Sequence, residues 1–207
     1  MNGDPKLYEL LEQLGIAYEY IEHPEAPTIE IAKQYWAGHD ARHCKNLFFR
    51  NHKGNQHYLV LLDCDAEMNI HAIEQQLHQG KLSFASPERL MKYLGVKPGS
   101  VTPFGLINDV EHHVIVFVDR NLQQAERVSY HPCENTASLI IKRADLEKFL
   151  DYQGNRWEWI DLYWLLNLNP SYEKNILSTL LHFVVFVGCS AAVCTYSREY
   201  KGEKRIF

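Results

Sequence analysis

The chain has 207 residues, of which 46% are apolar, and a formal net charge of -5 at pH 7. This length suits one domain with an appendage, or at most two small domains, and the apolar fraction is sufficient for a substantial core. The negative charge argues against a protein that coats nucleic acid, although a local basic patch that meets one RNA end remains compatible with it.

The five cysteines of the sequence indicate a reducing compartment. Their number is odd and their spacing is not paired, so we expect no disulfide framework and a cytoplasmic protein. Residues 1–16 are acidic and amphipathic. They lack the basic-then-apolar order of a secretory signal.

The apolar periodicity and the turn residues predict a series of short elements. In chain order these are a helix over 5–14, a strand over 18–21, a helix over 28–36, strands over 45–50 and 58–63, helices over 70–77 and 86–94, a shaped loop over 96–108, strands over 114–118, 126–130 and 138–142, and a helix over 144–152. Asp4, Thr28 and Ser86 are the expected N-cap residues. Because helices and strands are interleaved without strict alternation, we expect an α+β fold with a mixed sheet.

The composition changes after residue 163. Residues 176–194 are almost uncharged and precede a basic stretch over 198–205. The apolar segment has the length of a marginal membrane span, but its polar side chains weaken that interpretation. A buried hairpin or helix, or an extension that docks on the domain, is the alternative. We therefore expect a domain over 1–163 and an extension of unknown role over 164–207.

The sequence lacks the motifs of several common kinds of catalytic or metal site. The sequence has no phosphate-binding loop of the Walker type and no serine nucleophile elbow. His39, His43 and Cys44 are close in sequence, as are His131 and Cys133, but neither group has the paired spacing of a zinc site. We therefore expect neither a metal nor a cofactor.

Cys44 with His43 as its base is an alternative nucleophilic pair. Neighbouring residues of a strand point to opposite faces, and a lone cysteine is more often a small buried apolar group.

Three segments stand out together. Residues 44–50 read Cys-Lys-Asn-Leu-Phe-Phe-Arg, and Lys45 within them is either a snorkelling edge residue or a pocket cation. The second segment covers 83–90 and continues over 95–106 with its glycines and prolines. The third, over 130–137, reads Tyr-His-Pro-Cys-Glu-Asn-Thr-Ala.

In this order and spacing, the segments closely resemble the YbaK-like family, and in particular its free-standing prolyl-tRNA editing members. These are relatives of the editing domain inserted in bacterial prolyl-tRNA synthetases. The resemblance runs from the first helix to about Leu162, with further matches over 22–24 and 108–109. It implies a mixed, largely antiparallel and partly barrel-like sheet with packed helices.

The resemblance also implies an activity, namely hydrolysis of a mischarged aminoacyl ester on tRNA. For this subgroup the expected substrate is alanyl-tRNA carrying the proline anticodon. The implied partners are the tRNA acceptor end and prolyl-tRNA synthetase. A non-catalytic module of the same fold that binds tRNA or a synthetase is the alternative.

The resemblance carries the family's site residues onto this sequence. Lys45 matches the essential lysine, residues 99–103 match the GxxxP substrate loop, and His131 matches the histidine of the third motif. The expected catalytic residues are Lys45, Gly99, Ser100 and His131, and the expected substrate-binding residues are Asn46, Val101, Thr102, Pro103, Thr28 and Asn108.

Because the ester is already activated, the site has to position water and stabilise an oxyanion. Lys45 is expected to anchor a phosphate or the substrate backbone, with electrostatic action near the carbonyl as an alternative. A role as base would require a depressed pKa. In the family the terminal ribose hydroxyl is expected to help activate water. His131 then either orients the ribose or the water, or holds the loop around Asn135.

Overall fold

The computed structural model describes residues 1–26, 29–65, 69–78 and 80–161, which belong to one compact unit, Met1–Leu162. Its α-helices are α1 (Pro5–Gln13), α2 (Ile29–Trp36), α3 (Ile70–Leu77), α4 (Pro87–Leu94) and α5 (Arg143–Gln153). Its strands are β1 (Tyr18–Glu22), β2 (Arg42–Arg50), β3 (His57–Asp63), β4 (Ser83–Phe84), β5 (Val114–Asp119), β6 (Arg127–Tyr130), β7 (Ala137–Lys142) and β8 (Trp157–Ile160).

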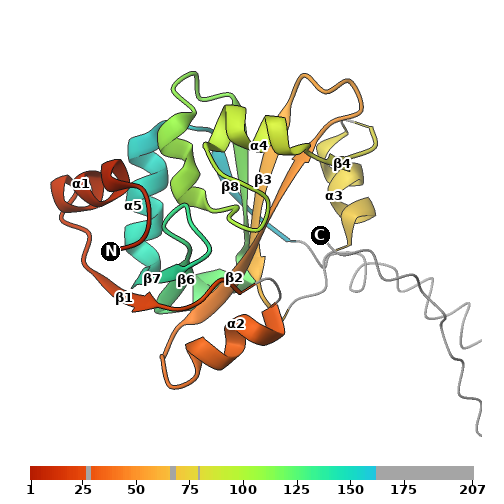
Figure 1. Ribbon diagram of the computed structural model, residues 1–207. Coiled ribbons are helices and arrows are strands. Elements are labelled where there is room, and N and C mark those ends of the chain that lie inside the picture. The colour runs from red at the N-terminus through yellow and green to blue at the C-terminus, as the bar shows by residue number, and fades with distance from the viewer. Residues whose placement is uncertain (27–28, 66–68, 79, 162–207) are drawn as a thin grey trace, which may run out of the picture. The chain divides into compact units, whose positions relative to one another are not determined.

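The strands form one mixed sheet in the order β1-β7-β6-β2-β3-β5-β8, with β4 paired to β2 (Figure 1). Four strand pairs are antiparallel and three are parallel. The predicted mixed sheet with packed helices is confirmed. Among the described strands no pairing joins β1 to β8, so the sheet is open.

Strand β2 belongs to both halves of the sheet. Its first residues, Arg42 and His43, pair in parallel with β6, and Phe49 and Arg50 near its end pair with β4. Its other edge pairs with β3 from Cys44 onward. Between the two short pairings, one edge of β2 therefore has no strand partner within the described chain, and the sheet divides there.

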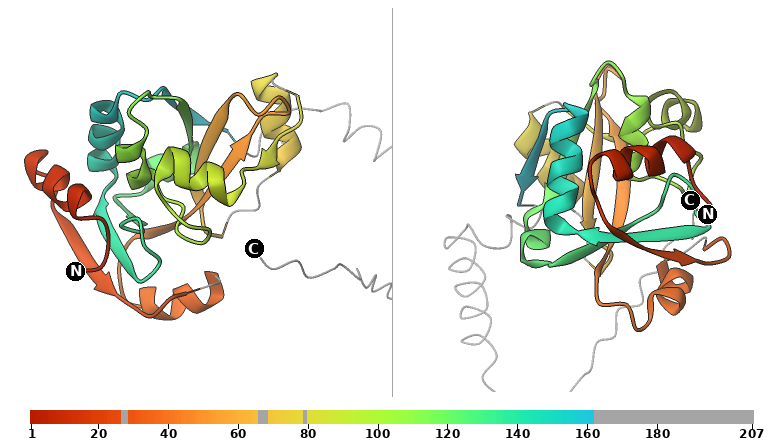
Figure 2. Two further views of the ribbon diagram at one scale, coloured as in Figure 1. Left: turned by 45° about the horizontal axis from the view of Figure 1, so that its top comes forward. Right: turned by 90° about the vertical axis from the view of Figure 1, so that its left-hand side faces the viewer.

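The helices cover the sheet because their apolar positions recur at helical spacing. In α1 and α5 the buried side chains Leu7, Leu11, Leu146 and Phe149 join a core cluster that extends across β3, β5 and β7. Figures 1 and 2 show α1 and α5 side by side on one flank, α3 on the other, and α2 beyond the lower end of the sheet.

The expected helix ends are confirmed in part. The Asp4 carboxylate accepts a hydrogen bond from Lys6 N at 2.9 Å, as an N-cap should. Ser86 is the N-cap residue of α4, as expected, but its side chain makes no cap hydrogen bond. It interacts instead with the Glu88 carboxylate, whose pKa this hydrogen bond lowers. Thr28 lies outside the described residues.

The structure contains short elements that the periodicity did not predict. The expected loop over 96–108 ends in a 3-10 helix, η1 (Pro103–Asn108), which begins at a proline and is capped by the Thr102 side chain. A second 3-10 helix, η2 (Arg120–Gln124), and the strands β4 and β8 were also missed. His112 and His113 precede β5 and do not lie in a strand.

The expected boundary at 163 and the apolar segment over 176–194 lie outside the described residues. Among the described helices, none has both the length and the apolar character that a membrane crossing requires.

Candidate active site

The division of the sheet at β2 positions the first predicted site residues. Lys45 and Asn46 lie opposite Leu62 and Leu61 of β3, on the stretch of β2 that has no partner along its other edge. An edge without a strand partner leaves room for a loop to approach. Both residues are therefore held rigidly by β3 on one side and are open to other segments on the other.

Asn46 connects this strand to the predicted substrate loop. Its Nδ2 donates a hydrogen bond to the Val101 carbonyl at 2.9 Å. Consecutive strand residues point to opposite faces, so Lys45 projects from the other face of β2. There its charge acts on Cys64, whose pKa is raised by burial and lowered in part by Lys33 and Lys45. The side chains of Lys45 and Asn46 therefore project from opposite faces of β2 at the point where the sheet divides.

The loop over 99–103 is shaped by its own sequence. Gly99 has φ +86°, a backbone conformation that favours glycine. Ser100 N donates to Lys97 O at 3.1 Å, which closes a turn. Pro103 then begins η1 at the first helical position, where a missing N–H has no cost.

Thr102 ties this loop to the third predicted segment. Its buried hydroxyl accepts a hydrogen bond from Phe104 N at 3.3 Å and donates one to the His131 carbonyl at 2.7 Å. The hydroxyl therefore uses both its donor and an acceptor position within the protein. Thr102 positions the loop against His131, and its side chain is already committed to that contact.

The His131 ring is held in one orientation. Its Nδ1 lies 3.0 Å from the Ala137 carbonyl, so Nδ1 carries the proton and donates. Burial lowers the pKa of His131, with a smaller contribution from the nearby His23. The ring is therefore neutral at pH 7, and Nε2 remains an acceptor.

The segment around His131 is fastened at several points. Asp4 N donates to Pro132 O at 3.1 Å, and a Cβ added to Gly3 would lie 2.6 Å from that same oxygen. Cys133 has φ +69°, an unfavourable backbone conformation for this residue. Such a conformation persists only where its surroundings impose it, and here the N-terminal residues supply the packing.

A buried hydrogen-bond network next to this segment was not predicted from the sequence. Trp36 Nε1 donates to Ser138 Oγ at 3.2 Å, and Ser138 Oγ lies 3.1 Å from His23 Nε2. His23 Nδ1 lies 2.8 Å from the Pro24 carbonyl, so Nδ1 is the donor and Nε2 accepts from Ser138. The network fixes α2 and the 23–26 segment to β7. The match of residues 22–24 to the family was its one signal in the sequence.

Asn108, predicted to bind substrate, has a structural use. Its Nδ2 donates to Leu94 O at 3.0 Å and to Gly105 O at 3.3 Å, which fastens the end of α4 to η1. Both amide hydrogens are therefore occupied. Substrate binding by Asn108 and by Thr28 stays a prediction.

The alternative nucleophilic pair is not supported by the electrostatics. Burial raises the pKa of Cys44 to about 12, so its reactive thiolate is not populated at pH 7. The His43 ring stacks on Trp36 with centroids 4.2 Å apart, and burial lowers its pKa to about 4. Both residues belong to the packing of β2.

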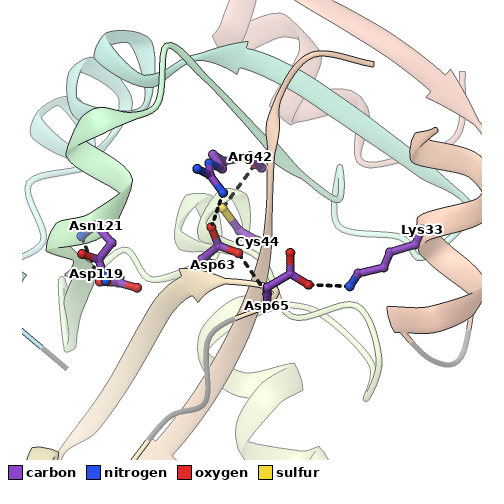
Figure 3. Close-up of polar contacts among 7 residues, drawn as sticks. All are labelled: Lys33, Arg42, Cys44, Asp63, Asp65, Asp119 and Asn121. Carbon is purple, nitrogen blue, oxygen red and sulfur yellow. Dashed lines mark hydrogen bonds and ion pairs between the residues drawn. The ribbon is translucent and has the colours of Figure 1, made fainter. Parts of the chain in front are cut away.

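A group of potential metal ligands lies at the end of β3, and Figure 3 shows two of them, Asp63 and Asp65. Asp63, Cys64 and Asp65 hold their ligand atoms within 4.8 Å of one another. Arg42 lies 3.3 Å from Asp63, and Lys33 forms an ion pair with Asp65. The carboxylates are thus already neutralised by cations, and the group was not among the histidine and cysteine pairs that the sequence suggested.

Comparison with known families agrees with this arrangement. The family model for the aminoacyl-tRNA editing domain matches residues 23–149. That span is more than half of the chain and contains the loop, Lys45 and the His131 segment. The chain belongs to the aminoacyl-tRNA editing domain family, and the resemblance inferred from the three segments is confirmed.

Two relatives are similar to this chain over most of its length. The chain is 40% identical over 162 residues to the prolyl-tRNA editing protein ProX of Acetoanaerobium sticklandii, covering 78% of this chain and 99% of that protein. It is 32% identical over 148 residues to prolyl-tRNA synthetase associated domain-containing protein 1 of Danio rerio, covering 70% of this chain and 80% of that protein.

A solved structure shares the fold. The crystal structure of a candidate trans-editing enzyme for prolyl-tRNA synthetase superposes with a TM-score of 0.58 at 22% identity. The superposition covers 78% of this chain and 98% of that one. The expected fold class is confirmed by this likeness.

Proposed function

We propose that this chain is a trans-editing aminoacyl-tRNA deacylase, with alanyl-tRNA for proline as its substrate. The observation that carries the proposal is the direct linkage of the 99–103 loop to both Asn46 and His131. Membership of the editing family supports it, as does the ProX relative.

The loop backbone is the proposed oxyanion site. Ser100 N is already bonded to Lys97 O, whereas within the described residues the N–H groups of Val101 and Thr102 have no hydrogen-bond acceptor. Preorganised backbone donors of this kind stabilise the negative charge that develops on the carbonyl oxygen during ester hydrolysis. Ser100 then contributes to the shape of the turn rather than donating its N–H.

Lys45 and His131 have separate proposed roles. Lys45, projecting from the other face of β2, anchors a phosphate or the substrate backbone as a cation. The neutral His131 ring offers Nε2 as an acceptor for a ribose hydroxyl of the tRNA. That hydroxyl then assists the attacking water, so the protein itself needs no catalytic triad.

Specificity is proposed to come from the size of the pocket. A pocket that holds alanine excludes proline sterically, whereas a larger pocket distinguishes a missing methylene by only about 1–3 kcal/mol. We further propose that the editing domain spans 1–163, that it acts in the cytoplasm, and that prolyl-tRNA synthetase is a second partner.

The test is a deacylation panel in which alanyl-, seryl-, cysteinyl- and prolyl-tRNA are presented in parallel. The wild-type chain should release alanine fastest and leave prolyl-tRNA intact. Binding without turnover on every ester would overturn the hydrolase in favour of a binding module.

In the same assay Lys45→Ala should lower kcat/KM for alanyl-tRNA by at least about 100-fold, the scale of a lost charge-stabilising contact. Lys142→Ala is the matched control, because Lys142 is exposed at the N-terminus of α5 and makes no capping hydrogen bond. Equal losses in the two variants would remove Lys45 from the site.

A further inference from the structure

Asn135 has an amide that is only half used. The residue is 7% exposed, and its Nδ2 donates to the Ala26 carbonyl at 3.0 Å. This bond fixes which end of the amide is nitrogen, because a carbonyl oxygen accepts only from a donor. Within the described part of the chain, Asn135 Oδ1 is buried and has no hydrogen-bond partner.

A buried acceptor without a donor is unfavourable and rare in native proteins. The Asn135 amide adjoins the substrate loop, because a Cβ built on Gly99 would lie 3.7 Å from Asn135 Nδ2. Asn46, which contacts the same loop at Val101, also has a buried Oδ1 without a partner in the described residues. Two asparagine amides therefore border the loop, and each has a buried oxygen without a hydrogen-bond partner in the described residues.

The proposed substrate offers a donor that suits such acceptors. In an aminoacyl ester, the α-carbon next to the carbonyl group carries an ammonium group with three N–H donors. The neighbouring His131 is held neutral by burial, so no positive charge on that ring opposes an ammonium. When the ester carbonyl lies at the loop backbone, its ammonium lies within reach of groups that border the loop.

We propose that Asn135 Oδ1 binds the α-ammonium group of the aminoacyl ester, which makes Asn135 a specificity-determining residue for esters with a free amino group. This inference rests on the proposed deacylase function. It assigns to Asn135 a contact with substrate in addition to its hydrogen bond to Ala26. If the role of Asn135 were purely structural, its only contact of consequence would be the hydrogen bond to Ala26.

The two roles are separated by a pair of substrates. Alanyl-tRNA and propionyl-tRNA carry acyl groups of similar size on the same tRNA for proline, and the second has hydrogen where the first has ammonium. Asn135→Ala should lower kcat/KM for alanyl-tRNA by roughly 10- to 100-fold more than for propionyl-tRNA, as expected for a hydrogen bond to a charged group. Structural damage alone would lower both values by the same factor.

Asn155→Ala is the matched control. Asn155 is also buried, its Nδ2 donates to Val114 O at 2.9 Å and to Asp109, and its Oδ1 also has no partner among the described residues. It lies at the start of β5 and β8, and not at the loop. Its loss should reduce thermal stability and leave the ratio of the two substrates unchanged.

The wild-type chain alone supplies a second measurement, which does not depend on a variant that folds. Its preference for alanyl- over propionyl-tRNA should exceed the ratio of their uncatalysed hydrolysis rates in the same buffer. A preference equal to that ratio, or equal losses for both substrates in Asn135→Ala, overturns the ammonium contact while the deacylase stands. Wild type that hydrolyses neither ester overturns the deacylase itself.

Discussion

The region around His131 and the region around His57 each hold a histidine whose pKa burial lowers, but they use the ring differently. His57 has both nitrogens engaged, with Nδ1 2.9 Å from His113 and Nε2 2.8 Å from Arg89. His131 uses Nδ1 for the Ala137 carbonyl, and Nε2 makes no hydrogen bond within the described residues. Burial alone therefore does not distinguish the two histidines. The unused acceptor of His131 does, and it is the basis of the role that we propose for this residue.

The residues that surround the two histidines also differ. His57 packs between Phe48 and Tyr93 and contributes to the packing of β2, β3 and α4. The His131 segment instead contains Cys133 in a left-handed conformation and borders the substrate loop through Thr102.

Within this comparison, the largest expected effect on activity tests His131 Nε2, which makes no hydrogen bond within the described residues. His131→Ala should lower kcat/KM for alanyl-tRNA by about 100-fold, the lower range for a group that assists proton transfer. Its free energy of unfolding should fall by only about 1 kcal/mol, the value of one hydrogen bond. Deacylation kinetics and urea unfolding on the same preparation check both. A stability loss with unchanged kinetics would make the two histidines alike.

The converse substitution is His57→Ala. It should lower the free energy of unfolding by about 3 kcal/mol, because it opens a cavity and leaves Arg89 and His113 without their partner. Activity per folded molecule should stay within about twofold of wild type, measured at a temperature well below the melting point. A selective loss of kcat/KM in a stable variant would contradict the structural role.

The pH dependence of stability should reside in the histidines whose pKa burial lowers, which are His57, His43 and His131. Burial lowers the pKa of His57 to about 4, and His43 behaves likewise, whereas an unfolded histidine titrates near 6.5. Between these values the unfolded chain binds more protons, so stability falls as pH drops from about 6.5 toward 4.

His57 and His43 should each cost about 1 kcal/mol per pH unit over that range. Urea unfolding at pH 7 and pH 5 measures the loss, which should be smaller in His57→Ala than in the wild type. An unchanged difference between the two pH values in that variant would assign the effect to other groups.

The smallest effect concerns the packing under the His131 segment. Gly3 has φ +121°, and an added Cβ would meet Pro132 O at 2.6 Å. Gly3→Ala should lower the free energy of unfolding by about 2 kcal/mol and reduce activity a few-fold, because the segment must shift. Gly38→Ala is the control, since Gly38 also has positive φ but no atom within 4 Å of an added Cβ. Equal effects in Gly3→Ala and Gly38→Ala would mean that the positive φ, and not the contact with Pro132 O, causes the loss.

Much of the architecture was predictable because it depends on local pattern. Apolar periodicity and proline and glycine positions located α1, α4 and α5 and most strands. Strand β8 was missed because Trp157–Ile160 is only four residues long and pairs in parallel with the distant β5. β4 has two residues, which no periodicity can reveal. These elements are defined by their partners.

The site followed the same rule. The three segments predict Lys45, the 99–103 loop and His131 as site residues, because their residue types and spacing are specific. The directions of the side chains came only from tertiary structure. Lys45 and Asn46 lie on the same strand, but alternation places their side chains on different faces, and Asn46 is the one that donates to the loop at Val101. The orphan oxygen of Asn135 depends on Ala26, far away in sequence, so no local pattern contained it.

The division of the sheet at β2 has a consequence for how the enzyme folds. Lys45 follows directly on the pairing of Arg42 with Val128 and of His43 with Ser129, which joins the early and late parts of the domain. Pairings between distant residues close large loops and form slowly. This arrangement of β2 therefore cannot form in an N-terminal fragment that lacks β6, and we expect deacylation to begin only when synthesis and folding have passed β7.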